Sequence, residues 1–209
     1  MGEEVFAEYQ GFDKLVVAEV LKDNNNEGEG EGYVTGDVTV LAPAGEISKT
    51  TPNDSAVKFY DNKAFLVISS EGSDEVTLTV PQLPVSKIAK LLGKHLDEET
   101  GALMDSGKPG NKYFAIGYRL LFTDGTYRYI WRHKGMFKLG DEAAKSKDDT
   151  TDTNNQTLTF TGITTDHNFT KTNEGSKAIV VDERDGKCDV STWFDAVVTP
   201  DSIKSKTAV

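Results

Sequence analysis

The chain has 209 residues, and its 23 lysines and arginines against 34 aspartates and glutamates give a formal net charge of −11 at pH 7. Such a surface repels phosphate, which argues against wrapping of DNA or RNA on a basic face and against peripheral binding to an anionic membrane. Hydrophobic residues make up 37% and charged residues 27%, a composition that excludes collagen, coiled coils and wholly disordered chains.

Cysteine content and the N-terminal residues indicate where the protein is made and which kinds of site it can contain. The single cysteine, Cys188, excludes an intrachain disulfide and argues against a cysteine-based zinc site. The first residues lack the basic and apolar regions of a secretory signal, and no apolar run is long enough to span a membrane. We therefore expect a protein that is made in a cytoplasm and stays soluble there at first.

The first 80 residues predict a β-rich domain. Apolar runs and period-two alternation place strands at 15–21, 34–41, 56–60, 64–69 and 75–80. Residues 23–32 read DNNNEGEGEG, and the glutamates between the glycines would repel phosphate. We therefore predict a flexible acidic loop there instead of a phosphate cradle.

One helix is clearly predicted after these strands. Pro84 is suited to its first turn and Gly93 to its end. Between them one face of the helix is apolar, formed by Val85, Ile88, Ala89, Leu91 and Leu92. A helix this short needs a sheet to pack on.

Residues 113–139 predict a β-hairpin around Asp124-Gly125, a two-residue turn signal. With Thr123 opposite Thr126, the register pairs Phe122 with Tyr127, Leu120 with Tyr129, Tyr118 with Trp131 and Ile116 with His133. One face is then almost wholly aromatic and apolar, while the other carries Arg119, Arg128 and Arg132. An arginine stripe on an acidic protein is typical either of a solvated face or of a subunit interface, and we favour the interface.

The aromatic face of this hairpin has two readings. Buried, its rings belong to the core, which is the default expectation. Exposed, they would form a platform for sugars or bases, made of Tyr118, Tyr127, Tyr129 and Trp131.

The last third of the chain alternates between loops and short elements. Residues 140–156 are acidic and without periodicity, which predicts a long loop; a calcium site is the weaker alternative to a solvated acidic run. Strands are predicted at 157–161 and 178–181, and a short helix capped by Ser191 at 191–197. Residues 199–209 are predicted to fray as a flexible C-terminal tail.

No constellation for catalysis or metal binding is present in the sequence. His95, His133 and His167 are far apart and lack metal-ligand spacing, and no base accompanies Cys188. We expect no enzymatic activity, no cofactor and no metal.

Several segments resemble the major tail proteins of long, non-contractile-tailed phages, which form the tail tube. The likeness covers roughly residues 55–198 in order. It rests on 76–93, on 112–119 (KYFAIGYR), 124–131 (DGTYRYIW) and 134–137 (KGMF), and on 156–162 (QTLTFTG) and 193–195 (WFD).

This resemblance implies a mainly β fold of two roughly orthogonal sheets, as a sandwich or open barrel, with a short flanking helix. It implies a single tail-tube domain over 1–198, with long loops at 23–32 and 140–156, followed by the tail 199–209. The implied assembly is a six-fold ring whose sheets join edge to edge around a lumen, with rings stacked into a tube through loops and terminal arms.

The implied function is structural, as a virion protein that assembles in the host cytoplasm. DNA passes along the lumen without specific binding, and the partners are further copies together with tail tip, tape measure and tail terminator proteins. The acidic net charge agrees with a lumen that repels phosphate. We expect intersubunit contacts at Arg119, Arg128, Arg132, Asp141, Glu142, Asp148 and Asp149.

Two other functions remain open from the sequence. One is the tube protein of a bacterial secretion or contractile device with the same fold. The other is a monomeric β-sandwich that binds glycans through the aromatic hairpin.

Overall fold

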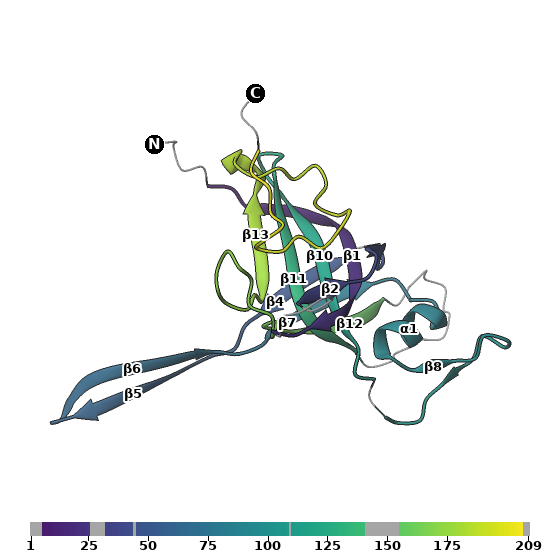
Figure 1. Cartoon of the computed structure of the whole chain (residues 1–209), viewed down its shortest axis with the longest axis horizontal. Coiled ribbons are helices and arrows are strands. Elements are labelled where there is room, and N and C mark those ends of the chain that lie inside the picture. Colours follow the sequence, from purple (N-terminus) through teal and green to yellow (C-terminus); the bar gives the residue numbers. More distant parts are fainter. Residues whose placement is uncertain (1–5, 26–31, 44, 109, 141–154, 207–209) are drawn as a thin grey trace, which may run out of the picture.

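The computed structural model describes residues 6–25, 32–43, 45–108, 110–140 and 155–206. It is mainly β and is built on one antiparallel sheet of nine strands, in the order β2-β1-β10-β11-β12-β7-β4, with β3 beside β1 and β13 beside β11 (Figure 1). These strands are β1 Tyr9–Asp23, β2 Tyr33–Thr35, β3 Thr39–Val40, β4 Glu46–Thr50, β7 Asp74–Val80, β10 Tyr113–Phe122, β11 Tyr127–Leu139, β12 Gln156–Ile163 and β13 Ala178–Asp182.

Two hairpins, β5 Asn53–Tyr60 with β6 Lys63–Glu71 and β8 His95–Leu96 with β9 Leu103–Met104, form separate small sheets. The helical elements are α1 Val85–Leu92 and the 3-10 turn η1 Glu183–Asp185. No described helix is long and apolar enough to cross a membrane.

The main sheet curls around its principal core. Leu15 and Val17 of β1 pack in one buried cluster with Val76 and Leu78 of β7, although three strands separate β1 from β7 in the sheet. The strand β11 allows this because its first half pairs with β13 and its second half with β12. The expected two packed sheets are therefore one continuous, branched sheet that folds over on itself.

A second cluster covers the opposite face of β1, β10 and β11. Trp131 and Tyr129 pack there against Trp193 and Val197 from the C-terminal segment. The buried indole N–H of Trp131 donates to the carbonyl oxygen of Trp193 at 2.9 Å. Aromatic packing thus fixes the C-terminal segment on the sheet.

Residues 191–197 do not form the predicted helix but a series of turns, with N–H groups bonded three residues back, as from Trp193 to Val190. A helix would need the Trp193 carbonyl for the N–H four residues on, and that carbonyl accepts from Trp131 instead. Ser191 was predicted to cap this segment with its side chain. Instead, a side-chain oxygen of Asp189 accepts the hydrogen bond of the Ser191 N–H, at 3.0 Å.

Residues 199–206, predicted to fray, instead pair with the chain before these turns. The Asp189 N–H donates to the Lys204 carbonyl at 3.0 Å, and the Lys206 N–H to the Lys187 carbonyl at 2.7 Å. Ile203 packs against the second cluster. Hydrogen bonding and burial therefore hold this segment in place.

The predicted hairpin exists, but its register is wrong by one residue. Leu121 pairs with Tyr127, Leu120 with Arg128, Arg119 with Tyr129, Tyr118 with Ile130, Gly117 with Trp131 and Ile116 with Arg132. The loop has three residues, because Gly125 adopts φ +84° after a turn closed by its N–H to the Phe122 carbonyl at 3.0 Å. A slip of one residue changes which side chains share a face.

Most other predicted elements are confirmed. The strands at 15–21, 56–60, 64–69, 75–80, 157–161 and 178–181 lie within β1, β5, β6, β7, β12 and β13. The predicted strand 34–41 is two short strands, β2 and β3, and β4, β8 and β9 were not predicted. The helix α1 begins after Pro84, ends at Gly93 with φ +62°, and buries Ala89 and Leu91.

The predicted acidic loop 23–32 begins with Asp23, which is the last residue of β1 and is held in place by the rest of the fold. Asp23 accepts the N–H groups of Asp166 and His167 at 2.9 Å and forms an ion pair with Lys134 at 2.6 Å. Burial alone would raise the pKa of Asp23, but these hydrogen bonds outweigh it and lower the pKa below its usual range. Residues 26–31 of the predicted loop lie outside the described residues.

Stability is expected to fall in mild acid because of His133. Its ring is fully buried and its Nε2–H donates to the Val198 carbonyl at 2.9 Å. Burial lowers its pKa below the ordinary value, so below about pH 6.5 the unfolded chain binds a proton that the folded chain does not. The free energy of unfolding should drop by about 1 kcal/mol between pH 7.5 and 5.5.

Urea unfolding at both pH values tests this prediction. His133→Asn should remove most of the pH dependence, whereas His95→Gln, which changes an exposed ring, should retain it. Equal pH dependence in the wild type and the His133 variant would show that another group is responsible.

Candidate functional site

The hairpin β5–β6 projects from the body as an arm, at the opposite end of the molecule from α1 (Figure 1). Its strands pair from Asn53 with Glu71 to Tyr60 with Lys63. Asp61 and Asn62 make the turn with φ +50° and +60°, the positive values that a two-residue hairpin turn requires at both positions. All eight side chains of β5 are exposed.

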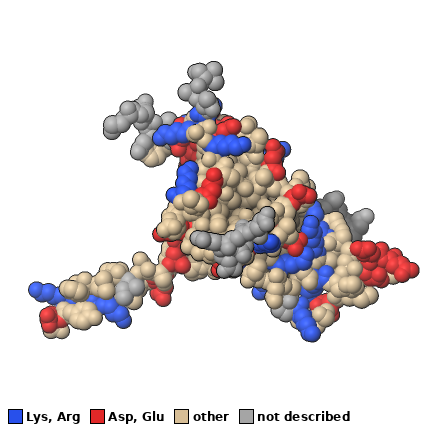
Figure 2. Space-filling model, in the orientation of Figure 1, with Lys and Arg blue, Asp and Glu red and all other residues tan. Residues whose placement is uncertain are grey.

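The arm carries large apolar side chains that nothing else in the described part of the chain covers. The exposed fractions are 67% for Phe59, 76% for Phe65 and 62% for Val67. Tyr60 and Phe65 contact each other edge to face, with ring centroids 5.5 Å apart. Figure 2 shows the arm as a mostly tan projection with charged side chains at its free end. Clustered apolar surface is typical of interaction sites, which makes the arm a candidate for one.

The base of the arm is held firmly to the sheet. The Gly72 N–H donates to the Pro52 carbonyl at 2.8 Å, which closes the hairpin at its root. Lys177, just before β13, donates to Glu71 Oε1 at 2.9 Å and to the Gly72 carbonyl at 2.8 Å. The arm therefore leaves the body in a direction set by several hydrogen bonds.

A buried ion pair connects this base to the centre of the sheet. Asp74, the first residue of β7, pairs with Arg132 of β11, and both side chains are almost fully buried. The Thr51 hydroxyl donates to Asp74 Oδ1 at 2.7 Å, and Lys49 Nζ lies 3.7 Å from the same oxygen. Arg132 also donates to the Tyr118 hydroxyl at 3.3 Å. The carboxylate of Asp74 thus joins both sides of the arm's root to the interior.

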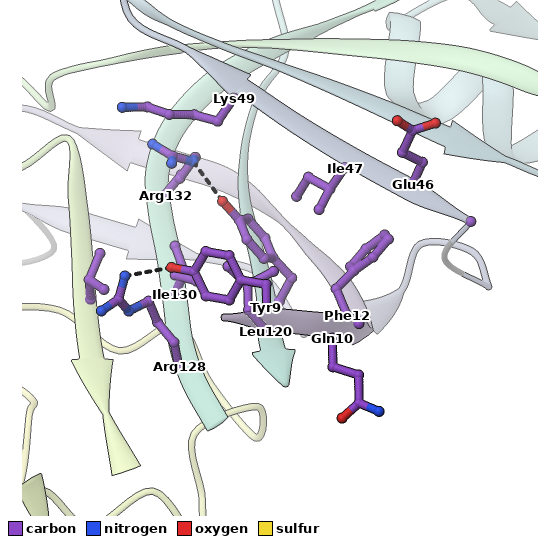
Figure 3. A pocket seen from close by; sticks show the side chains of 14 residues that line it. Tyr9, Gln10, Phe12, Glu46, Ile47, Lys49, Leu120, Arg128, Ile130 and Arg132 are labelled. Atoms are coloured by element: carbon purple, nitrogen blue, oxygen red, sulfur yellow. Dashed lines mark hydrogen bonds between the residues drawn. The ribbon is translucent and has the colours of Figure 1, made fainter. Parts of the chain in front are cut away.

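Next to this ion pair lies an open hollow of about 750 Å³, lined by residues of β1, β4, β10, β11 and β13 (Figure 3). Phe12, Ile47, Leu120 and Ile130 give it apolar walls. Its charged lining comes from Glu46, Lys49, Arg128 and Arg132.

Arg128 is fixed in the wall of this hollow by two partners. It donates from Nε and Nη2 to the two carboxylate oxygens of Asp182, at 2.5 and 2.7 Å, and from Nη1 to the Tyr9 hydroxyl at 2.5 Å, as Figure 3 shows for Tyr9. The hydrogen bond from Arg128 lowers the pKa of Asp182.

The three predicted interface arginines do not share a face. Arg128 and Arg132 line the hollow, whereas the corrected register puts Arg119 on the opposite face, beside Tyr129. Arg119 forms a bidentate pair with Asp13, at 2.6 and 2.9 Å, and its guanidinium lies 3.9 Å from the ring centroid of Tyr127. Each arginine therefore has a carboxylate partner within the chain. The predicted acidic positions Asp141, Glu142, Asp148 and Asp149 lie outside the described residues.

The aromatic residues considered for a glycan platform are mostly core residues. Tyr118, Tyr129 and Trp131 are buried, and Tyr127 is half-buried. The described ranges contain no group of three histidine, cysteine or acidic side chains placed to hold a metal ion. Burial raises the pKa of the Cys188 thiol, which disfavours its nucleophilic thiolate form.

The sequence predicted the strands of the arm but not their projection from the body. The run Phe65-Leu66-Val67 is typical of a buried strand, and only the Asp61-Asn62 turn signal indicates an independent hairpin. The hollow was not predicted, because the wrong register separated Arg128 and Arg132 from Tyr118 and Leu120.

No protein-family model matches this chain, and a search of curated proteins likewise finds no match.

The ion pair at the root of the arm is expected to be essential for stability. Asp74→Ala leaves Arg132 buried without its main partner, which should lower the free energy of unfolding by about 3–5 kcal/mol. Chemical denaturation measures this loss. Glu75→Ala changes the exposed neighbour on the same strand and should cost less than about 0.5 kcal/mol.

The double variant Asp74→Leu/Arg132→Met distinguishes the loss of the ion pair from a loss of side-chain packing as the cause of the lower stability. It removes both buried charges, so it should recover much of the stability that Asp74→Ala loses. An Asp74→Ala variant as stable as Glu75→Ala would show that the pair contributes nothing.

Proposed function

We propose that this protein is a structural subunit that assembles with copies of itself, and that the assembly is the tube of a phage tail, built of stacked six-fold rings. The observation that carries the proposal is the arm β5–β6, whose apolar side chains lie in solvent on a firmly anchored base. The resemblance of residues 55–198 to tail tube proteins supplies the particular assembly.

The exposed apolar side chains of the arm favour a protein that assembles with other copies over one that acts as a monomer. Leaving Phe59, Tyr60 and Phe65 in water costs free energy that contact with another surface recovers, at roughly 25 cal/mol for each Å² of apolar area removed from water. The net charge of −11 opposes unspecific clustering of such surfaces between copies. A contact of defined geometry buries the apolar side chains of the arm and still keeps the negatively charged copies from clustering unspecifically.

Open sheet edges give further support. In the described part of the sheet, β4 pairs only with β7, and β13 pairs only with β11. Such edges attract further strands, and ring closure is one way in which proteins cover them. These surfaces would serve a secretion-device tube equally well, and the genes encoded nearby would distinguish the two.

Electron microscopy of the concentrated wild-type protein tests the proposal. We expect rings or hollow tubes, grown if necessary on added tail-tip complexes. A protein that stays monomeric under both conditions would contradict the proposed function.

Removing the apolar side chains of the arm should prevent assembly without unfolding the subunit. In Phe59→Ser/Phe65→Ser both changed side chains are exposed, so the melting temperature should stay close to that of the wild type while rings and tubes disappear. Met104→Ser, an exposed apolar position outside the arm, is the matched control and should assemble normally. Normal tubes from the arm variant would exclude the arm from the contacts.

A further inference from the structure

We propose that the tip of the arm of one copy seats in the hollow beside Arg128 of a second copy. This inference rests on the proposed function and specifies which two surfaces meet. The arm carries a cluster of exposed apolar side chains, and the hollow is an open surface cavity with largely apolar walls.

The hollow suits the tip in size and chemistry. Its volume of about 750 Å³ is within the range of sites that bury a whole ligand, so it has room for side chains such as Phe59 and Phe65. Its walls at Phe12, Ile47 and Leu120 are aromatic or aliphatic, as are Phe59 and Phe65 beside the tip. Aromatic pairs gain stabilisation beyond the buried area alone.

The strands beside the hollow offer backbone partners as well. Ile47 belongs to β4 and Val180 to β13, and both strands have one edge without a pairing strand in the described sheet. A hairpin entering between them can add its backbone to either edge, as extended segments do in strand addition.

Charge is complementary between the tip and the hollow. The tip turn carries Asp61, and the hollow presents Arg128 and Lys49. A guanidinium has five N–H donors, and the bonds of Arg128 to Asp182 and Tyr9 use three of them, so two can meet another carboxylate. Lys63, next to the turn, has Glu46 as its counterpart on the other wall.

The geometry requires a second copy. The root of the arm is held by Lys177 and by the Pro52–Gly72 hydrogen bond, and the arm points away from the body that contains its own hollow (Figure 1). Because the arm and the hollow are different surfaces, each copy that donates an arm can also accept one. Such heterologous contacts close into rings or continue as filaments, and they do not stop at a dimer.

Cross-linking between two single-cysteine variants tests the contact. One variant carries Lys63→Cys at the arm tip and the other Gln10→Cys at the hollow, both in a Cys188→Ala background. These positions are exposed and polar, so neither change removes an apolar contact. The two are mixed under assembly conditions and treated with a short bismaleimide.

We expect at least ten times more covalent dimer from this mixture than from a control mixture in which Glu98→Cys, exposed on the β8–β9 turn, replaces the arm cysteine. Tubes with dimer at the control level, or with arm-to-arm dimers from Lys63→Cys alone, would overturn the seating but leave the proposed function intact. A wild-type protein that forms no rings or tubes would overturn both.

Discussion

The buried ion pair between Asp74 and Arg132 is the interaction on which the arrangement of this molecule depends. It connects β7 to β11, strands that are separated by β12 in the curled sheet, and it lies where the arm begins. A buried carboxylate is costly unless its charge and its hydrogen bonds are satisfied, and Thr51, Lys49 and Arg132 together supply those contacts. The same contacts fix the root of the arm, so a single polar cluster both closes the core and aims the arm outward.

A fixed direction of the arm would favour the proposed contact between copies. If the hairpin moved freely, each contact with another copy would first have to order it, and that entropy would be lost from the binding free energy. Two-stranded hairpins are only marginally stable alone, and the hydrogen bonds at Gly72, Glu71 and Lys177 stabilise the arm within the single subunit. The strong negative charge of the chain works in the same direction, because it disfavours contacts that do not bury enough apolar surface.

The sequence predicted correctly those helices and strands whose turn residues and hydrophobic pattern agree with their packing in the folded chain. Pro84 and Gly93 bound α1, and the alternation of Val76, Leu78 and Val80 is the buried face of β7. Prediction failed where one backbone angle or one distant contact decides. Gly125 in a left-handed conformation lengthens the loop by one residue and moves Arg119 to the face opposite Arg128, while the hydrogen bond from Trp131 to the Trp193 carbonyl replaces a helix with turns. The projection of the arm depends on Asp74 and Arg132, which are 58 residues apart in sequence.

Amide hydrogen exchange is the most direct test of whether the arm joins one copy to the next, because it compares the same strands in the free and the assembled protein. In dilute solution the outward-facing amides of residues 53–71 should exchange quickly, since no other part of the described chain covers them. After assembly we expect strong new protection of the amides in the arm and in β4 and β13, while exchange in the buried strand β7 changes little. Unchanged exchange across the arm in assembled particles would contradict the claim that this hairpin joins one copy to the next.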